Sequence, residues 1–329
     1  MTKSAYIRWS SPEVILVATN LLEGHKLTLH AIYQAKRSNA KVLLVHVVPP
    51  SSWRTQSHDE MLSPLPSHLL RNVKVKLDEM ASEFQRESVE CESILLKGLP
   101  EEQISLLVKS RSVDRVILAT RNVAGVARLA EGSIAEELIA NLQIPVCVIG
   151  RRVHPGPACD TPLGRVLLAT SFRLDSLLLA SVASALSESD HSQLTLLHVL
   201  ETDGMSVREG NLARAMAQRQ LCALVPNQSA CRVQPVFLVQ EGDPATIILR
   251  EAGSMSQDLV ILGSPRPSKV SRLCDTSVFN RVVVDLECPV ITIRPTAEAT
   301  EVYLRALNKT ECTPSGLRAI QKLALHRRI

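Results

Sequence analysis

The chain has 329 residues, of which 45% are hydrophobic and 21% are charged, so it is long enough for two globular domains and too apolar to be disordered. Its formal net charge of +4 is too small to indicate binding to nucleic acid. No apolar run is long enough to span a membrane, and the N-terminal residues lack the apolar stretch of a secretory signal. We therefore expect a cytoplasmic protein with no membrane partner.

Aliphatic runs alternate with helical patterns in the first part of the chain. We predict strands near 13–19, 41–48, 90–97, 115–120 and 145–150. Between them we predict helices near 25–38, 66–87, 100–111 and 132–142. This alternation indicates βαβ crossovers and a parallel sheet. The aliphatic strands, in a chain with only 3% aromatic residues, are typical of a sheet that helices cover on both faces.

A polar segment rich in proline and glycine follows. The stretch "RRVHPGPACDTPLG" at 151–164 predicts a domain boundary. We predict a first domain over 1–154, a linker over 155–164, a second domain over 165–297 and a C-terminal tail over 298–329. The end of the tail is basic and mildly amphipathic, and we interpret it as a docked or frayed terminal helix.

The second part of the chain repeats the first. We predict strands near 165–170, 193–200, 233–240, 258–263 and 289–294, and helices near 174–188, 206–223, 243–253 and 276–286. "EVILVATN" at 13–20 matches "RVLLATS" at 165–171, and "DRVILATR" at 114–121 matches "DLVILGSP" at 258–265. "IPVCVIGR" at 144–151 matches "CPVITIRP" at 288–295. The repeating unit of about 145 residues has the size of a domain.

This ordered series of motifs, occurring twice, resembles the universal stress protein family in its tandem form. Each unit has a G-x-P-like turn before its third helix, a D-x-V-I-[LM]-G/A strand and a loop ending in [GT]-S. Each ends in a C/I-P-V-x-[VI]-I strand, in which the second unit has Thr292 at the [VI] position. The resemblance covers about 12–151 and 163–295. It implies two Rossmann-like α/β domains, each a five-stranded parallel sheet of order 3-2-1-4-5 with helices on both faces.

The resemblance also implies how the two domains meet and where they bind ligands. Family members commonly pair through their fifth strands, so we expect an intramolecular pseudo-dimer in which strands 145–150 and 289–294 face each other. Such pairing would cover two strand edges that otherwise invite aggregation. Ligands are expected outside the carboxyl ends of the strands, at the switch point between the first and fourth strands.

In ATP-binding members the loop after the fourth strand reads G-x2-G-x9-G-[ST], and an Asp ends the first strand. By this resemblance the first domain has Asn20 at the Asp position and Ala119, Asn122, Gly132 and Ser133 along the loop. Asn20 keeps hydrogen bonding but loses the charge. Ala119 adds a methyl group where the backbone approaches a ligand, whereas Asn122 tolerates a left-handed turn.

The second domain departs further from the motif. Its equivalent positions are Ser171, Gly263, Arg266, Thr276 and Ser277. Pro265 and Pro267 have no N–H to donate, and Thr276 is β-branched where glycine is expected. Glu131 in the first copy and Asp275 in the second come just before the final helix, where a carboxylate would compete with a phosphate for the helix N-terminus.

No enzymatic motif accompanies these loops: H-E-x-x-H, G-x-S-x-G and G-x-x-x-x-G-K-[ST] are all absent from the sequence. We interpret His46 and His198 as structural histidines at the rim of the sheet, with a role in ligand contact left open. We expect Cys147 and Cys288 to be buried, reduced thiols.

The sequence therefore predicts a non-enzymatic stress-response module that acts by regulation or interaction with an unidentified protein partner. It predicts no cofactor, or ATP held weakly in a degenerate site of the first domain. The alternative is an adenine-nucleotide-binding protein or enzyme of a related fold, with a working site in the first domain.

Overall fold

The computed structural model describes residues 8–21, 24–50, 67–120, 134–155, 162–173, 175–201, 204–225, 232–264 and 278–294. The first half contains β1 (Val14–Ala18), α2 (Gly24–Ser38), β2 (Lys41–Val48), α3 (Ser67–Arg86), β3 (Cys91–Lys97), α4 (Pro100–Ser110), β4 (Arg115–Ala119), α5 (Ile134–Asn141) and β5 (Val146–Ile149). The second half contains β6 (Arg165–Ala169), α6 (Ser176–Asp190), β7 (Gln193–Leu200), α7 (Val207–Leu224), β8 (Val236–Glu241), α8 (Pro244–Ser254), β9 (Leu259–Gly263), α9 (Val278–Asp285) and β10 (Val290–Ile293). Every strand and helix predicted within the two repeats is present, with ends shifted by up to three residues. The terminal helix expected in the tail lies outside the described residues.

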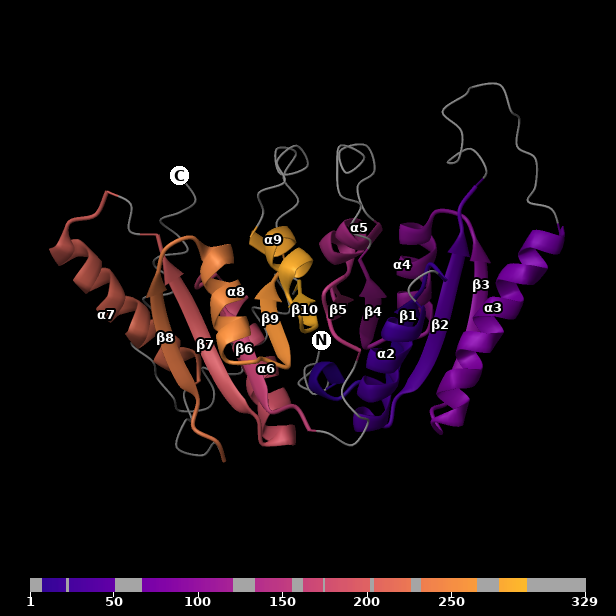
Figure 1. Cartoon of the computed structure of the whole chain (residues 1–329), viewed down its shortest axis with the longest axis horizontal. Coiled ribbons are helices and arrows are strands. Elements are labelled where there is room, and N and C mark those ends of the chain that lie inside the picture. The colour runs from indigo at the N-terminus through magenta and orange to yellow at the C-terminus, as the bar shows by residue number, and fades with distance from the viewer. Residues whose placement is uncertain are drawn as a thin grey trace, which may run out of the picture.

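The strands of both halves form one sheet of ten strands, in the order β3-β2-β1-β4-β5-β10-β9-β6-β7-β8 (Figure 1). Each half thus has the predicted order 3-2-1-4-5, and its own strands are parallel. The halves join where β5 pairs with β10 in antiparallel register, with Ile291 opposite Cys147. The expected pairing of the fifth strands is therefore what the structure shows.

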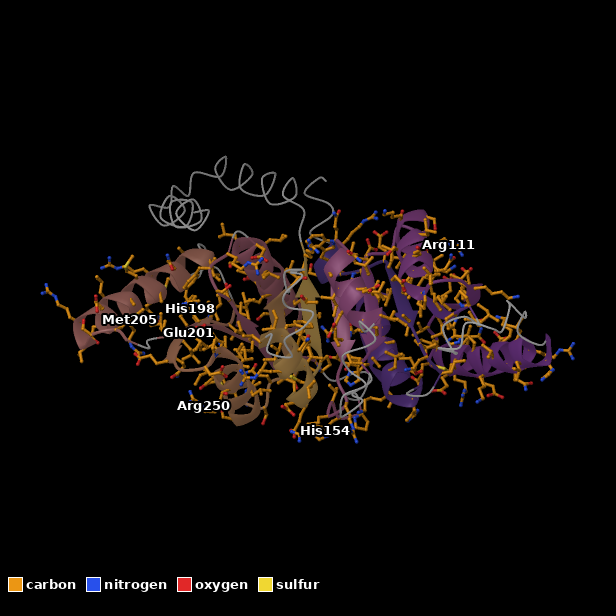
Figure 2. All side chains as sticks on the ribbon, turned by 90° about the horizontal axis from the view of Figure 1, so that it is seen from above. Arg111, His154, His198, Glu201, Met205 and Arg250 are labelled. Atoms are coloured by element: carbon orange, nitrogen blue, oxygen red, sulfur yellow. The ribbon has the colours of Figure 1, made fainter. Side chains whose placement is uncertain are left out.

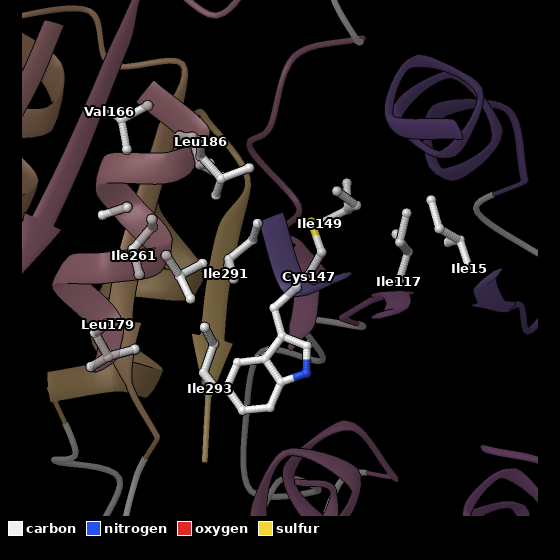
Figure 3. Close-up of a cluster of buried hydrophobic side chains, with 14 of the residues drawn as sticks. Ile15, Ile117, Cys147, Ile149, Val166, Leu179, Leu186, Ile261, Ile291 and Ile293 are labelled. Carbon is white, nitrogen blue, oxygen red and sulfur yellow. The ribbon is translucent and has the colours of Figure 1, made fainter. Parts of the chain in front are cut away.

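Helices cover both faces of the sheet. One apolar core lies under α2, α3, α6 and α7, and a second lies under α4, α5, α8 and α9. Both cores extend across the β5–β10 seam. The first does so through Cys147, Ile149, Ile291 and Ile293 (Figure 3), and the second through Val146, Val148 and Val290. Cys147 and Cys288 are free and buried, as predicted.

The segment before β1, for which the sequence suggested no role, belongs to the core. Trp9 is only 2% exposed and packs into the core under α2 and α6. Its carbonyl oxygen accepts a hydrogen bond of 2.6 Å from the Arg115 guanidinium. The Asp114 carboxylate accepts the N–H groups of Glu13 and Val14 at 2.9 and 3.0 Å. These contacts hold the segment against the start of β4.

Polar contacts reinforce the apolar seam between the halves. Arg37 at the end of α2 forms an ion pair with Asp190 at the end of α6, and Asp190 is almost completely buried. On the other face, the hydroxyl of Ser264 donates to the carbonyl oxygen of Ile139 at 3.2 Å. Gly150, directly after β5, lies so close to α9 that a Cβ there would be 2.5 Å from the main-chain oxygen of Val283.

The close approach at Gly150 predicts a destabilising substitution. Gly150→Ala would place its methyl group against the backbone of α9, which cannot yield as a flexible side chain would. We expect the change to lower the free energy of unfolding by about 1–3 kcal/mol, as overpacking does elsewhere. Urea unfolding of the purified chain measures this loss.

Gly210 in α7 provides the matched control, because a Cβ there meets no atom within 4 Å. Gly210→Ala removes backbone freedom from the unfolded chain and should stabilise the protein by about 0.5–1 kcal/mol. Equal effects from the two substitutions would contradict the assigned packing of Gly150.

A second prediction concerns His30, which is 4% exposed in α2. Its Nε2–H donates to the carbonyl oxygen of His154 at 2.9 Å. Burial, the largest influence, lowers the pKa of His30 below the usual 6.5, against the raising effect of this hydrogen bond. The unfolded chain therefore binds more protons as the pH falls through 6.5, so acidification destabilises the fold.

His30→Gln retains a side-chain donor but cannot titrate. Between about pH 7.5 and about pH 5.5, the urea midpoint of the native chain should fall more steeply than that of His30→Gln. If the two chains lose stability in parallel, His30 is not the group responsible.

Candidate functional site

The carboxyl ends of β1 and β4 meet at the switch point of the first half. The two strands are neighbours, with Ala18 paired to Leu118, and β1 has β2 on its other side. Asn20 lies two residues beyond β1, and Ala119 is the last residue of β4; both are half-buried. The structure thus brings these two predicted site residues to one edge of the sheet.

The rest of the predicted loop positions fall outside the described residues. In the first half these are Asn122, Glu131, Gly132 and Ser133, and in the second half they are Pro265, Arg266, Pro267, Asp275, Thr276 and Ser277. The roles suggested for them stay predictions.

The chain turns in the same way as it leaves the first strand of each half. The hydroxyl of Thr19 accepts the N–H of Leu21 at 3.0 Å, and that of Thr170 accepts the N–H of Phe172 at 3.2 Å. Leu21 has φ 65° and Phe172 has φ 56°, in the left-handed region that such residues rarely adopt. Strained backbone of this kind costs about 1–3 kcal/mol and occurs most often where proteins bind ligands. Leucine and phenylalanine carry no sequence signal for a positive φ.

A histidine from the second strand of each half, His46 or His198, hydrogen-bonds to each of these turns. His46 Nδ1 lies 2.8 Å from the carbonyl oxygen of Thr19, and His198 Nδ1 lies 2.8 Å from that of Thr170. Because a carbonyl oxygen can only accept, Nδ1–H is the donor in both contacts. This geometry agrees with the structural interpretation of both residues.

The second half carries an additional carboxylate that sequence comparison missed. A Cβ built on Gly263, the last residue of β9, would lie 3.5 Å from a carboxylate oxygen of Asp175, an ordinary contact. The fold therefore does not require glycine at 263, and a negative charge lies near the end of β9. The ring of Phe172 packs against that of His198, which Figure 2 labels, with 4.2 Å between the ring centroids and a tilt of 33°.

The chemistry that these edges offer is hydrogen bonding by hydroxyl, amide, imidazole and main-chain groups. Within the described ranges, no cluster of three His, Cys, Asp or Glu residues is placed to hold a metal ion. None of the helices in the same ranges combines the length and the apolar character needed to cross a bilayer.

Comparisons with known proteins agree with this architecture. The model of the universal stress protein family matches the chain twice, at residues 12–150 and 162–294. Two universal stress proteins of Methanocaldococcus jannaschii are similar to it. One is 28% identical over 123 residues, which is 36% of this chain and 71% of that protein. The other is 22% identical over 153 residues, which is 42% of this chain and 94% of that protein.

A solved structure extends the likeness across both halves. The crystal structure of a universal stress protein from Archaeoglobus fulgidus superposes with a TM-score of 0.67 at 16% identity, covering 88% of this chain and 99% of that one. At this identity the likeness shows the fold. The double match of the family model shows more: this chain belongs to the universal stress protein family, with two tandem domains of that family on one polypeptide.

Proposed function

We propose that this protein is a non-enzymatic stress-response module that acts through regulation or interaction with a protein partner. In this proposal the first domain holds ATP weakly or not at all, and the second domain has lost the nucleotide. The observation that carries the proposal is the pair of neutral side chains, Asn20 and Ala119, where ATP-binding family members have a carboxylate and a glycine.

The strand exit supports a residual site in the first domain. Leu21 is held in a left-handed conformation by the hydroxyl of Thr19, and His46 fixes the carbonyl group of Thr19. A binding edge whose backbone is fixed in this way loses little entropy when a ligand arrives. Without the carboxylate and the glycine, however, it makes fewer contacts with a nucleotide.

Three features argue against a nucleotide in the second domain. The carboxylate of Asp175 lies near the end of β9, where it would repel a phosphate group. The aromatic stack of Phe172 on His198 occupies the corresponding strand exit. The sequence also has proline at 265 and 267, and proline lacks the main-chain N–H that could donate to a phosphate.

The alternative is an enzyme or adenine-nucleotide-binding protein with a working site in the first domain. The observation that favours this alternative is the left-handed backbone conformation of Leu21 after β1, because strained backbone often occurs at functional sites. Purified full-length protein distinguishes the two proposals. We expect no ATP turnover and little nucleotide released on denaturation, as read by mass spectrometry, whereas stoichiometric nucleotide or hydrolysis would favour the alternative.

Restoring the family residues should strengthen the first site. The double variant Asn20→Asp with Ala119→Gly regains a charge-assisted acceptor and removes a methyl group from the ligand edge. We expect ATP affinity to rise about tenfold or more in titration calorimetry, since one such hydrogen bond contributes roughly 1.5–3 kcal/mol.

The second domain supplies a matched control. Ser171→Asp gives it both family residues, because Gly263 is already present, yet we expect no ATP binding while Asp175 and the two prolines remain. A tenfold gain there would refute the explanation for the second domain. Tight binding of ATP by the unmodified chain, lost on substitution of Ser133, would refute the proposed degeneracy of the first.

A further inference from the structure

A cavity of about 1050 Å³ lies between the two halves, between α2 and α6 and over the seam. Its walls include Tyr33 from α2, Leu186 from α6 and Ile291 from β10, and the last two belong to the apolar cluster drawn in Figure 3. Arg115 and Leu259, which begin β4 and β9, also line it. The cavity is therefore at the amino ends of these strands, away from the carboxyl ends that carry the candidate nucleotide site. Its volume is that of a pocket for a small organic molecule.

Arg115 is the most unusual residue of this wall, because it is a cation that is only 4% exposed. One terminal nitrogen donates to the side-chain oxygen of Gln34 at 2.9 Å, and the other donates to the carbonyl oxygen of Trp9 at 2.6 Å. Its Nε is buried with no partner. A guanidinium has five N–H donors, so these two bonds leave most of its capacity unused.

No carboxylate in the described part of the chain forms an ion pair with Arg115. The carboxylate of its neighbour Asp114 accepts the main-chain N–H groups of Glu13 and Val14 instead. Burial, the largest influence, lowers the pKa of the Arg115 guanidinium, which nevertheless keeps its charge at neutral pH. A buried charge without a counterion is costly, and an anion in the cavity would offset that cost.

A second unpartnered group comes from the other half of the molecule. Gln257, which lines the same cavity, is 6% exposed, and its side-chain oxygen is buried without a hydrogen-bond donor. Such an oxygen requires an O–H or N–H group, because an unsatisfied buried acceptor destabilises the protein. The cavity wall thus includes a residue with an unpartnered donor from one half and a residue with an unpartnered acceptor from the other.

The remaining wall limits the charge of the ligand. Two further arginines and His154 line the cavity, and each is close to a carboxylate: Arg37 to Asp190, Arg152 to Asp285 and His154 to Glu287. Arg115 is therefore the lining cation left to meet an anion, and the neighbouring carboxylates disfavour a polyanion such as phosphate. Between these charges the wall also has aliphatic side chains, among them Leu186 and Ile291, which are both less than a tenth exposed. These features favour a single negative charge on an apolar body.

We infer that the cavity between the domains binds a small organic monocarboxylate, with its carboxylate on Arg115 and its apolar body against Leu186 and Ile291. A hydroxyl or N–H group elsewhere on the ligand would donate to Gln257. This site is independent of the nucleotide edge. It requires both halves of the chain, because Arg115 and Gln257 come from different domains.

Benzoate and benzamide test the inference, because they share a shape and differ in charge. With the full-length protein in titration calorimetry, we expect benzoate to bind at least tenfold more tightly than benzamide and more tightly than inorganic phosphate. Arg115→Gln should remove the preference for benzoate. Arg111→Gln, a change of the same kind at an exposed arginine far from the seam (Figure 2), should leave it intact.

A second variant keeps the test decisive if Arg115→Gln does not fold. Native protein should prefer 4-hydroxybenzoate to benzoate, and Gln257→Leu should abolish that preference while it retains benzoate binding. Equal affinity of the native chain for benzoate and benzamide would overturn the inference, as would stronger binding of phosphate. Competition by ATP, or an effect of Asn20→Asp on benzoate affinity, would overturn the claim that the two sites are independent.

Discussion

The antiparallel pairing of β5 with β10 is the interaction on which the rest of this structure depends. Within its own half each of these strands has one neighbour and would be an apolar edge, since all four residues of each are buried in the joined sheet. Exposed edges of this kind promote aggregation. Pairing removes both edges and makes the two apolar cores continuous across the seam.

In the joined sheet, the carboxyl ends and the amino ends of the strands have different surroundings. In each half the carboxyl ends of the first and fourth strands meet at the edge where we expected a ligand. Both halves have the same hydrogen-bonded turn at that edge, at Thr19 and Thr170. The surroundings of the two turns have diverged, with neutral residues in the first half and Asp175 in the second. At the amino ends, the pairing brings Arg115 of one domain and Gln257 of the other to one cavity.

Aliphatic runs and an internal repeat predicted the elements, because they report directly on sheet strands. The order of the strands and the pairing of the halves were implied by the resemblance to the universal stress protein family. The sequence did not reveal the burial of Trp9, since a lone aromatic residue before the first strand has no periodicity that would mark it as core. Leu21 and Phe172 could not be recognised as strained, because tertiary hydrogen bonds impose their backbone conformation. Asp175 was missed because its position near β9 depends on how α6 packs.

Hydrogen exchange of the full-length protein, measured by mass spectrometry, tests the central role of the seam most directly. The outer strands β3 and β8, each with one unpaired edge, provide the internal reference. If the pairing joins the halves into one cooperative unit, amides of β5 and β10 should exchange only through global unfolding, far more slowly than those of the outer strands. Exchange of β5 and β10 at the rate of the outer strands would show that the two halves separate in solution, and would contradict this account.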